Sequence, residues 1–353
     1  MGGKKSVRAR RFVLPVIAVL GLAATAAPAA AAGAGDAPAR DRADTTRPGR
    51  VRLITSFDAA AGELPEGIVV DAHRNMFVTL APRGELVRID RHGNRRLVAQ
   101  VAPAGKGFGA LGLAFDRRGG IVVAVASFDP ATAGVVRVVG HRTERIPGTE
   151  QITFPNGLAF GPRGALFVTD SAGGAVWRVG RDGSVEKWSE DPLLAGNGSL
   201  NLGVPLGANG IAYWRGSFYV VNTETGRIVR IPVTRDGAGP AEIVAEGPEL
   251  IGADGAQFDA RGNLYVAVNG QSTLLRLSPD GTLTTLATAA DGLDAPASPV
   301  FGVGRGDRST LYVTNFAFGH TDPSTAHPGI VALDAGVRGA PLPATSWGRH
   351  DGR

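Results

Sequence analysis

Six residues occupy the same position in a repeated sequence pattern, and several of them could hold a cation. Each stands directly before a short run of small and apolar residues, and successive positions are 45, 45, 53, 45 and 47 residues apart. These marker residues are Glu66, Leu111, Asn156, Asn209, Asp254 and Phe301. Carboxylate and amide oxygens are the ligands that hard divalent ions prefer. Two carboxylates in one narrow space repel each other, so the pattern predicts a cation among the polar markers Glu66, Asn156, Asn209 and Asp254.

Taken singly, the polar marker residues also have ordinary structural interpretations. Asn156 and Asn209 each precede a glycine, and Asn-Gly is a common turn dipeptide. Glu66 alone is typical of a solvated strand end, because glutamate is rarely buried without a partner. Their common position in the repeat is what favours a shared site.

The repeats predict the elements that position these residues. Each repeat contains four short apolar or alternating runs, separated by turn sequences such as Arg-Asp-Gly and Pro-Asp-Gly. A spacing near 45 residues is typical of propeller blades. We therefore predict an all-β fold, a six-bladed β-propeller of four-stranded antiparallel blades over residues 51–342, with the marker residues around its central channel. Residues 51–57 are expected to complete the sixth blade and close the ring.

The two ends of the chain differ from the repeats. Residues 1–32 combine a basic start, an apolar run and small residues, which predicts a cleaved secretion signal; an uncleaved membrane anchor is the alternative, and the export route stays open. Residues 33–50 are expected to form a disordered linker and residues 343–353 a flexible tail. We therefore expect a secreted, extracellular protein without stable membrane insertion after cleavage.

Composition excludes several kinds of function. Five of the 37 basic residues lie in the predicted signal, so the remainder is balanced against 32 acidic residues and no nucleic-acid partner is expected. The chain has no cysteine, which excludes disulfides, thiolate metal sites and a cysteine nucleophile. The sequence also lacks the G-x-S-x-G, H-E-x-x-H and P-loop motifs.

The marker motifs resemble those of the senescence marker protein/gluconolactonase (regucalcin-like) family, over roughly residues 51 to 335. The resemblance implies a six-bladed propeller with one divalent metal in the channel, calcium first, with zinc, magnesium or manganese as alternatives. Glu66 in PEGI, Asn209 in ANGIA and Asp254 in ADGAQFD resemble the family's metal ligands, and Asp254 also its proposed general base. Asn156 in PNGLA resembles the channel asparagine that contacts substrate or metal-bound water.

One departure from the family concerns the substrate. Sugar-lactone hydrolases of the family often carry an arginine where this chain has Phe154. Together with Leu111 and Phe301, Phe154 predicts an apolar wall and a less polar ring substrate, although ordinary packing is the alternative for each. The long segments 128–134, 191–208 and 316–329 are expected to lie on the same face as the marker residues and form a partial lid. His320 and His327 could shuttle protons there or be merely solvated.

Our leading interpretation is a metal-dependent hydrolase that opens a small-molecule lactone or ester. A divalent ion would polarise the carbonyl and activate a water, with Asp254 as the catalytic base. We expect a monomer. The alternative is a non-catalytic propeller, like the NHL-repeat proteins, that recognises a peptide, glycan or surface partner, and a strictosidine-synthase-like propeller is a third class.

Overall fold

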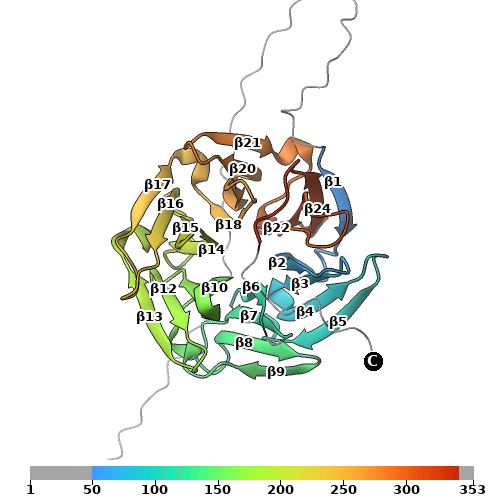
Figure 1. The fold of residues 1–353 in the computed structure, drawn as a ribbon. Helices are drawn as coiled ribbons and strands as arrows, with labels where there is room; N and C mark the ends of the chain where they lie inside the picture. Colours follow the sequence, from blue (N-terminus) through green and yellow to red (C-terminus); the bar gives the residue numbers. More distant parts are fainter. Residues whose placement is uncertain (1–49, 106, 118, 342–353) are drawn as a thin grey trace, which may run out of the picture.

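The computed structural model describes residues 50–341, apart from 106 and 118. The predicted signal, most of the linker and the tail lie outside these residues. Within them, six four-stranded antiparallel sheets surround a central axis, as predicted (Figure 1). The first strand of each sheet lies nearest the axis, and neighbouring inner strands contact one another around the whole ring.

The blades follow one another along the chain. Blade 1 comprises β2 (Pro65–Val70), β3 (Met76–Leu80), β4 (Glu85–Ile89) and β5 (Arg95–Gln100), and blade 2 comprises β6 (Gly109–Phe115), β7 (Ile121–Ala126), β8 (Gly134–Val139) and β9 (Arg142–Arg145). Blade 3 comprises β10 (Pro155–Phe160), β11 (Leu166–Asp170), β12 (Ala175–Val179) and β13 (Val185–Glu190), and blade 4 comprises β14 (Ala208–Trp214), β15 (Ser217–Asn222), β16 (Arg227–Pro232) and β17 (Glu242–Glu246). Blade 5 comprises β18 (Ala253–Phe258), β19 (Leu264–Val268), β20 (Thr273–Leu277) and β21 (Leu283–Ala287).

Blade 6 is built from both ends of the propeller sequence. Its inner strands are β22 (Pro296–Phe301), β23 (Thr310–Asn315) and β24 (Gly329–Asp334), and β1 (Arg52–Ser56) pairs with β24 as the outer strand. The prediction that residues 51–57 close the ring is therefore confirmed. Main-chain hydrogen bonds between β1 and β24 tie the N-terminal strand, which leads into blade 1, to the last blade, so the ring does not depend on side-chain packing alone.

Short 3₁₀ helices connect several strands. They are η1 (Ala81–Arg83), η2 (Thr149–Gln151), η3 (Pro162–Gly164), η4 (Pro192–Leu194), η5 (Pro248–Leu250), η6 (Asn269–Gln271), η7 (Ala289–Asp291) and η8 (Pro323–Thr325). Asp191, Thr288 and Asp322 accept main-chain hydrogen bonds at the starts of η4, η7 and η8. None of the described helices is long and apolar enough to cross a membrane.

Apolar side chains fill the spaces between blades. Second strands carry almost continuous apolar runs, such as IVVAVA in β7, because both faces of these strands are covered by neighbouring blades. Aromatic rings join adjacent blades: Phe77 meets Phe115 with ring centroids 5.6 Å apart, and Tyr265 meets Phe301 at 5.3 Å. This packing fixes the angle between blades and therefore the width of the channel.

The inner strands share a bulge and a close approach. In blades 1 to 5 the register with the second strand shifts directly after the residue that precedes the marker, and in blade 6 it shifts after Pro296. Five blades carry glycine after the marker. A Cβ on Gly210 would lie 2.3 Å from the carbonyl oxygen of Asp254, and one on Gly157 would lie 2.5 Å from that of Asn209. Glycine is required because the next blade's main chain occupies the space of a side chain.

This arrangement corrects the turn interpretation of the Asn-Gly pairs. Asn156 and Asn209 lie inside β10 and β14, and neither following glycine has a positive φ. A bulge redirects a side chain relative to the regular pleat. The dipeptide therefore serves the bulge and the blade contact.

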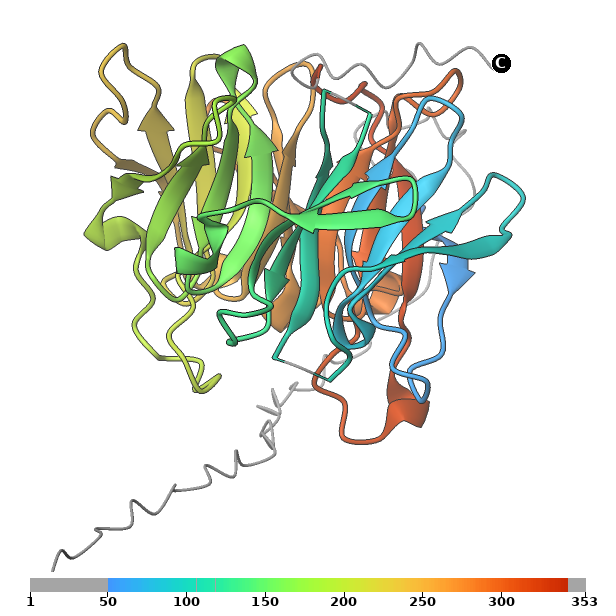
Figure 2. The same cartoon turned by 90° about the horizontal axis from the view of Figure 1, so that it is seen from below.

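The two faces of the propeller differ in loop length. Figure 2 shows long loops on the lower face of the ring, including the segments with η4 and η8, whereas the opposite face carries mainly short hairpin turns. The lower face is the one where the inner strands begin. The predicted placement of the long segments beside the marker residues agrees with this view, so the loops surround one mouth of the channel.

Candidate functional site

Strand register identifies the equivalent channel position in each blade. The residue before the marker pairs with the last or next-to-last residue of the second strand, in the pairs Pro65 with Leu80, Ala110 with Val125, Pro155 with Asp170, Ala208 with Asn222, Ala253 with Val268 and Pro296 with Asn315. Five of the predicted markers therefore occupy one ring. We call Glu66, Leu111, Asn156, Asn209, Asp254 and the sixth equivalent residue the channel ring.

The sixth equivalent residue is Ala297, so the assignment of Phe301 was wrong. Phe301 lies four residues later, at the other end of β22, where it pairs with Leu311 and packs against Tyr265. The error arose because Ala297 is followed by serine and proline in place of the glycine of the other repeats. Phe301 belongs to the core between blades 5 and 6, and its position gives no support to a substrate contact.

Two carboxylates of the channel ring influence each other electrostatically. Glu66 is 4% exposed, and its Oε2 is buried without a hydrogen-bond partner. Burial raises the pKa of the Glu66 carboxyl well above its ordinary value, and the charge of Asp254 raises it further. Desolvation also raises the pKa of Asp254 from 3.8 to about 7, although hydrogen bonds from Asn209 and Asn269 oppose the rise. The metal-free ring therefore favours protonated carboxyls.

The two asparagines of the ring are oriented by neighbouring hydroxyls. Asn156 donates from Nδ2 to Ser171 Oγ at 3.2 Å, and Asn209 donates from Nδ2 to Thr223 Oγ1 at 3.0 Å. Because the amide nitrogen faces the hydroxyl, the amide oxygen faces away from it. Both side chains are buried, with 6% and 7% of the residue exposed.

The donor set fits a hard divalent cation. Three side chains offer oxygen ligands. Glu66 has a buried carboxylate oxygen without a hydrogen-bond partner, and Asp254 is close enough to raise the pKa of Glu66. The amide nitrogen of Asn209 is already hydrogen-bonded, so its oxygen is the group available to a cation. Calcium and magnesium prefer such ligands. Among the described residues no cluster of three or more histidine, aspartate or glutamate side chains has metal-binding geometry, so an amide must contribute to any site at the ring.

Apolar side chains surround the ring on its loop-bearing face. Leu111 and Phe154 are both almost fully buried in one cluster with Leu206 and Phe316. Phe154 also meets Phe108 and Phe128 with ring centroids 5.2 and 5.3 Å apart. Phe154 and Leu111 are therefore packed in an apolar cluster, which also includes loop residues that the sequence did not indicate.

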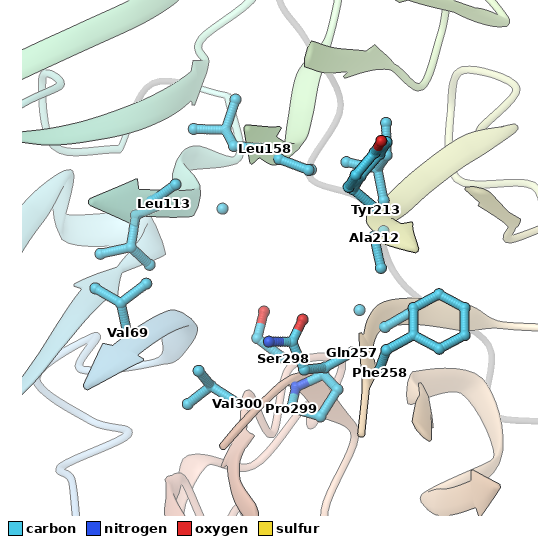
Figure 3. A pocket seen from close by; sticks show the side chains of 18 of the residues that line it. Val69, Leu113, Leu158, Ala212, Tyr213, Gln257, Phe258, Ser298, Pro299 and Val300 are labelled. Atoms are coloured by element: carbon cyan, nitrogen blue, oxygen red, sulfur yellow. The ribbon is translucent and has the colours of Figure 1, made fainter. Parts of the chain in front are cut away.

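An apolar cavity of about 150 Å³ occupies the channel beyond the ring. It begins at Gly112, Gly157 and Gly210, one residue past the ring, and reaches Ala340 and Pro341 at the C-terminal segment. Figure 3 shows the labelled side chains around it, with Val69, Leu113, Leu158 and Val300 forming apolar walls and Gln257 and Ser298 bringing polar atoms close together. No charged side chain lines this cavity in the described chain, so the carboxylates for a cation are confined to the ring.

Polar residues that end second strands anchor connecting segments. Asp170 accepts hydrogen bonds from the main-chain nitrogens of Thr153, Phe154 and Gly173. Asn222 donates to Leu193 O and Ala195 O, and Asn315 donates to Gly292 O. They hold the connections between blades in place.

The two loop histidines pair with one carboxylate. His320 Nε2 lies 2.9 Å from Asp294 Oδ1, and its Nδ1 lies 2.9 Å from Thr325 Oγ1. His327 donates its main-chain N–H to Asp294 Oδ2 at 2.7 Å. Asp294 precedes β22, so these contacts fasten the segment 316–329 to the connection between blades 5 and 6.

Sequence reasoning missed three residues that contact the ring. Ser171, Thr223 and Asn269 each follow the second strand of their blade and contact Asn156, Asn209 and Asp254 respectively. A sequence signal for these residues was present in the repeats. The position directly after the second strand is polar only in the three consecutive blades whose markers are Asn, Asn and Asp.

Comparisons with known proteins agree with this fold. Residues 206–317 match the family described as SMP-30/Gluconolactonase/LRE-like region, which agrees over these residues with the resemblance seen in the sequence. A search of curated protein sequences finds no match.

Solved structures share the propeller at low sequence identity. Regucalcin from Agrobacterium tumefaciens, described as a calcium-binding protein, is 19% identical with a TM-score of 0.62, covering 84% of this chain and 97% of its own. A gluconolactonase from Xanthomonas campestris is 16% identical with a TM-score of 0.58 and the same coverage. A luciferin-regenerating enzyme is 17% identical with a TM-score of 0.62, covering 84% of this chain and 99% of its own. These likenesses establish the fold.

Proposed function

We propose that this protein is a metal-dependent hydrolase that opens a lactone or ester at the channel ring. The observation that carries the proposal is the buried Glu66 Oε2, which has no hydrogen-bond partner and lies within electrostatic reach of Asp254. Leaving such an atom unpaired is costly, and a cation would compensate both carboxylates. The calcium-binding and gluconolactonase structural neighbours support the same proposal.

Glu66, Asn209 and Asp254 would hold the cation, with calcium as the first candidate and magnesium, manganese or zinc as alternatives. When bound, a divalent cation polarises a carbonyl and lowers the pKa of a water. Asn209 is suited to such a site because Thr223 already occupies its amide nitrogen. Glu66 is suited because its buried Oε2 has no hydrogen-bond partner comparable to Thr223.

Asp254 is the candidate general base. Its pKa of about 7 in the metal-free ring would match proton transfer near neutral pH. A carboxylate that also binds a cation is a weak base, so this role requires that one oxygen be available to the attacking water. Asn156 would orient the substrate, since it is the buried ring residue of the blade next to that of Asn209.

The surroundings favour a small and weakly polar substrate. Phe128 is exposed, and it packs with Phe108 on the buried Phe154, which lies in one apolar cluster with Leu111. A sugar lactone would place several hydroxyls against these side chains and lose hydrogen bonds to water. We therefore expect alkyl- or aryl-substituted lactones and esters to be better substrates than sugar lactones.

Metal analysis and hydrolysis assays test the proposal. The purified protein is expected to bind one divalent cation per chain and to hydrolyse members of a lactone and ester panel. Asp254→Ala is expected to lower kcat by about 10²-fold to 10⁴-fold. Asp280→Ala is a matched control, because Asp280 is an exposed carboxylate in a hairpin turn. Full activity in Asp254→Ala would remove this residue from the mechanism, and cation binding without hydrolysis of any panel member would favour a non-catalytic binding propeller.

We further propose that the protein is secreted after cleavage within its first 32 residues. The basic, apolar and small-residue order of that segment supports the proposal. Mass spectrometry of the protein recovered from culture medium would give the mature N-terminus. Recovery only from cells, with residues 1–32 intact, would contradict it.

A further inference from the structure

Three residues outside the ring contact both a ring side chain and the next blade. Ser171 donates to Ala208 O at 2.7 Å, Thr223 donates to Ala253 O at 2.8 Å and Asn269 donates to Ala295 O at 3.2 Å. Each acceptor lies in or just before the inner strand of the following blade. The same three side chains contact Asn156, Asn209 and Asp254 of their own blades.

The Asn209 amide nitrogen has two acceptors, Thr223 Oγ1 and the Asp254 carboxylate, and the hydroxyl chemistry at Thr223 determines the direction of the first hydrogen bond. A hydroxyl has one hydrogen, and Thr223 uses it on the carbonyl oxygen of Ala253. Toward Asn209, Thr223 Oγ1 can therefore only accept a hydrogen bond. The amide must present its nitrogen to Thr223, which leaves the amide oxygen for the channel. Ser171 imposes the same orientation on Asn156, since its hydrogen is used on Ala208 O.

We propose that Thr223 is the positioning residue that makes Asn209 an oxygen ligand. This inference rests on the proposed metal site at the ring. Without the hydroxyl the amide could turn over and direct its N–H groups at the cation, which repels them. Thr223 also fixes the spacing between blades 4 and 5, because it bridges Asn209 and the residue before Asp254.

The other blades show that this contact is specific to the amide and aspartate markers. The equivalent position holds Ala81, Ala126 and Phe316 in blades 1, 2 and 6, whose ring residues are Glu66, Leu111 and Ala297. Glu66, Leu111 and Ala297 have no amide to orient; Asp254 has none either, and its partner Asn269 instead donates to the carboxylate at 3.4 Å. The polar partner occurs only where an amide or Asp254 is present.

The experiment compares calcium affinity in matched variants of the full mature chain by calorimetry. Thr223→Val keeps the shape but removes the hydroxyl, and we expect it to weaken calcium binding about 10-fold to 100-fold, the usual effect of removing a partner of a metal ligand. Thr223→Ser is expected to restore binding to within about threefold of wild type. Thr79→Val is the control, because Thr79 also bridges two blades, from Gly67 N to Leu111 O, without touching a ring side chain.

A second pair of variants separates an effect on the orientation of the Asn209 amide from a general loosening of the contact between blades 4 and 5. In Asn209→Asp both side-chain atoms are oxygens, so adding Thr223→Val is expected to change calcium affinity less than threefold. An equal 10-fold loss in that background would overturn the inference, as would unchanged affinity in Thr223→Val alone. If wild type binds no divalent cation, both the inference and the proposed metal site fail.

A measurement on wild type keeps the inference testable if Thr223→Val does not fold. The side-chain amide protons of Asn209, identified by their loss in Asn209→Asp, are expected to exchange slowly with solvent because one is bound to Thr223 Oγ1. Rapid exchange of both protons would contradict the assigned orientation.

Discussion

Raising the pH of the metal-free protein from 5 to 8 is expected to lower its free energy of unfolding. The folded state raises the pKa of Asp254 from 3.8 to about 7, so it binds this proton more tightly than the unfolded chain does. The resulting stabilisation is fully present below pH 3.8 and is lost as the pH rises through about 7. Glu66 acts in the same direction, because its pKa is also raised.

The size of the effect follows from the shift at Asp254. Between pH 5 and pH 8 this group contributes a loss of about 3 kcal/mol, at 1.36 kcal/mol for each pKa unit. For a propeller of this size, that corresponds to a fall in Tm of roughly 5 °C. Calcium at 100 times its Kd is expected to restore about 2.7 kcal/mol at pH 8.

Thermal unfolding of the chelator-treated protein at several pH values measures the effect. Asp254→Asn provides the reference, since it keeps the shape and removes the titrating group. We expect the fall in Tm between pH 5 and 8 to be smaller in Asp254→Asn by roughly 5 °C, and calcium to have little effect on this variant. Identical pH dependence in the two proteins would refute the assignment of a destabilising charge to Asp254.

Three further predictions concern the architecture around the site. Gly210→Ala is expected to cost about 2 to 3 kcal/mol in urea unfolding, because its Cβ would lie 2.3 Å from Asp254 O, whereas Gly270→Ala, with its nearest atom at 3.3 Å, should cost less. Glu224→Ala should speed limited proteolysis between residues 196 and 206, since Glu224 Oε2 accepts hydrogen bonds from the main chain of Asn197 and Gly198; cleavage at the wild-type rate would argue against this tether. Deleting residues 50–57 removes β1 and should lower Tm by several degrees through loss of its pairing with β24, and an unchanged Tm would show that the pairing does not stabilise the ring.

The sequence predicted the fold well because each blade repeats the same signals. Four apolar runs, their turns and the spacing of five markers were enough to indicate six blades and the closing strand. Phe301 was misplaced because β22 has Ser298 and Pro299 where other inner strands have glycine and an apolar residue. The register of β22, and with it the ring position of Ala297, is visible only from the pairing of β22 with β23 in the structure.

The contacts of the ring could be predicted less completely. The oxygen-rich set Glu66, Asn209 and Asp254 was visible in the sequence, and the structure places these residues at equivalent positions of three inner strands. The orientation of Asn209 depends on where the single hydrogen of Thr223 is used, and that depends on a carbonyl in the next blade. Such a contact involves the packing of two repeats, which no single repeat specifies.

Closure by β1 also constrains the order of folding. Its partner β24 lies almost at the far end of the propeller sequence, so this sheet cannot be completed until nearly the whole chain is available. Contacts between residues so distant along the chain form slowly, because a long loop must be closed first. Until then blade 6 presents unpaired strand edges, which can pair with other chains. In a chain that crosses a membrane unfolded and N-terminus first, the ring would therefore be completed only after the last blade has crossed.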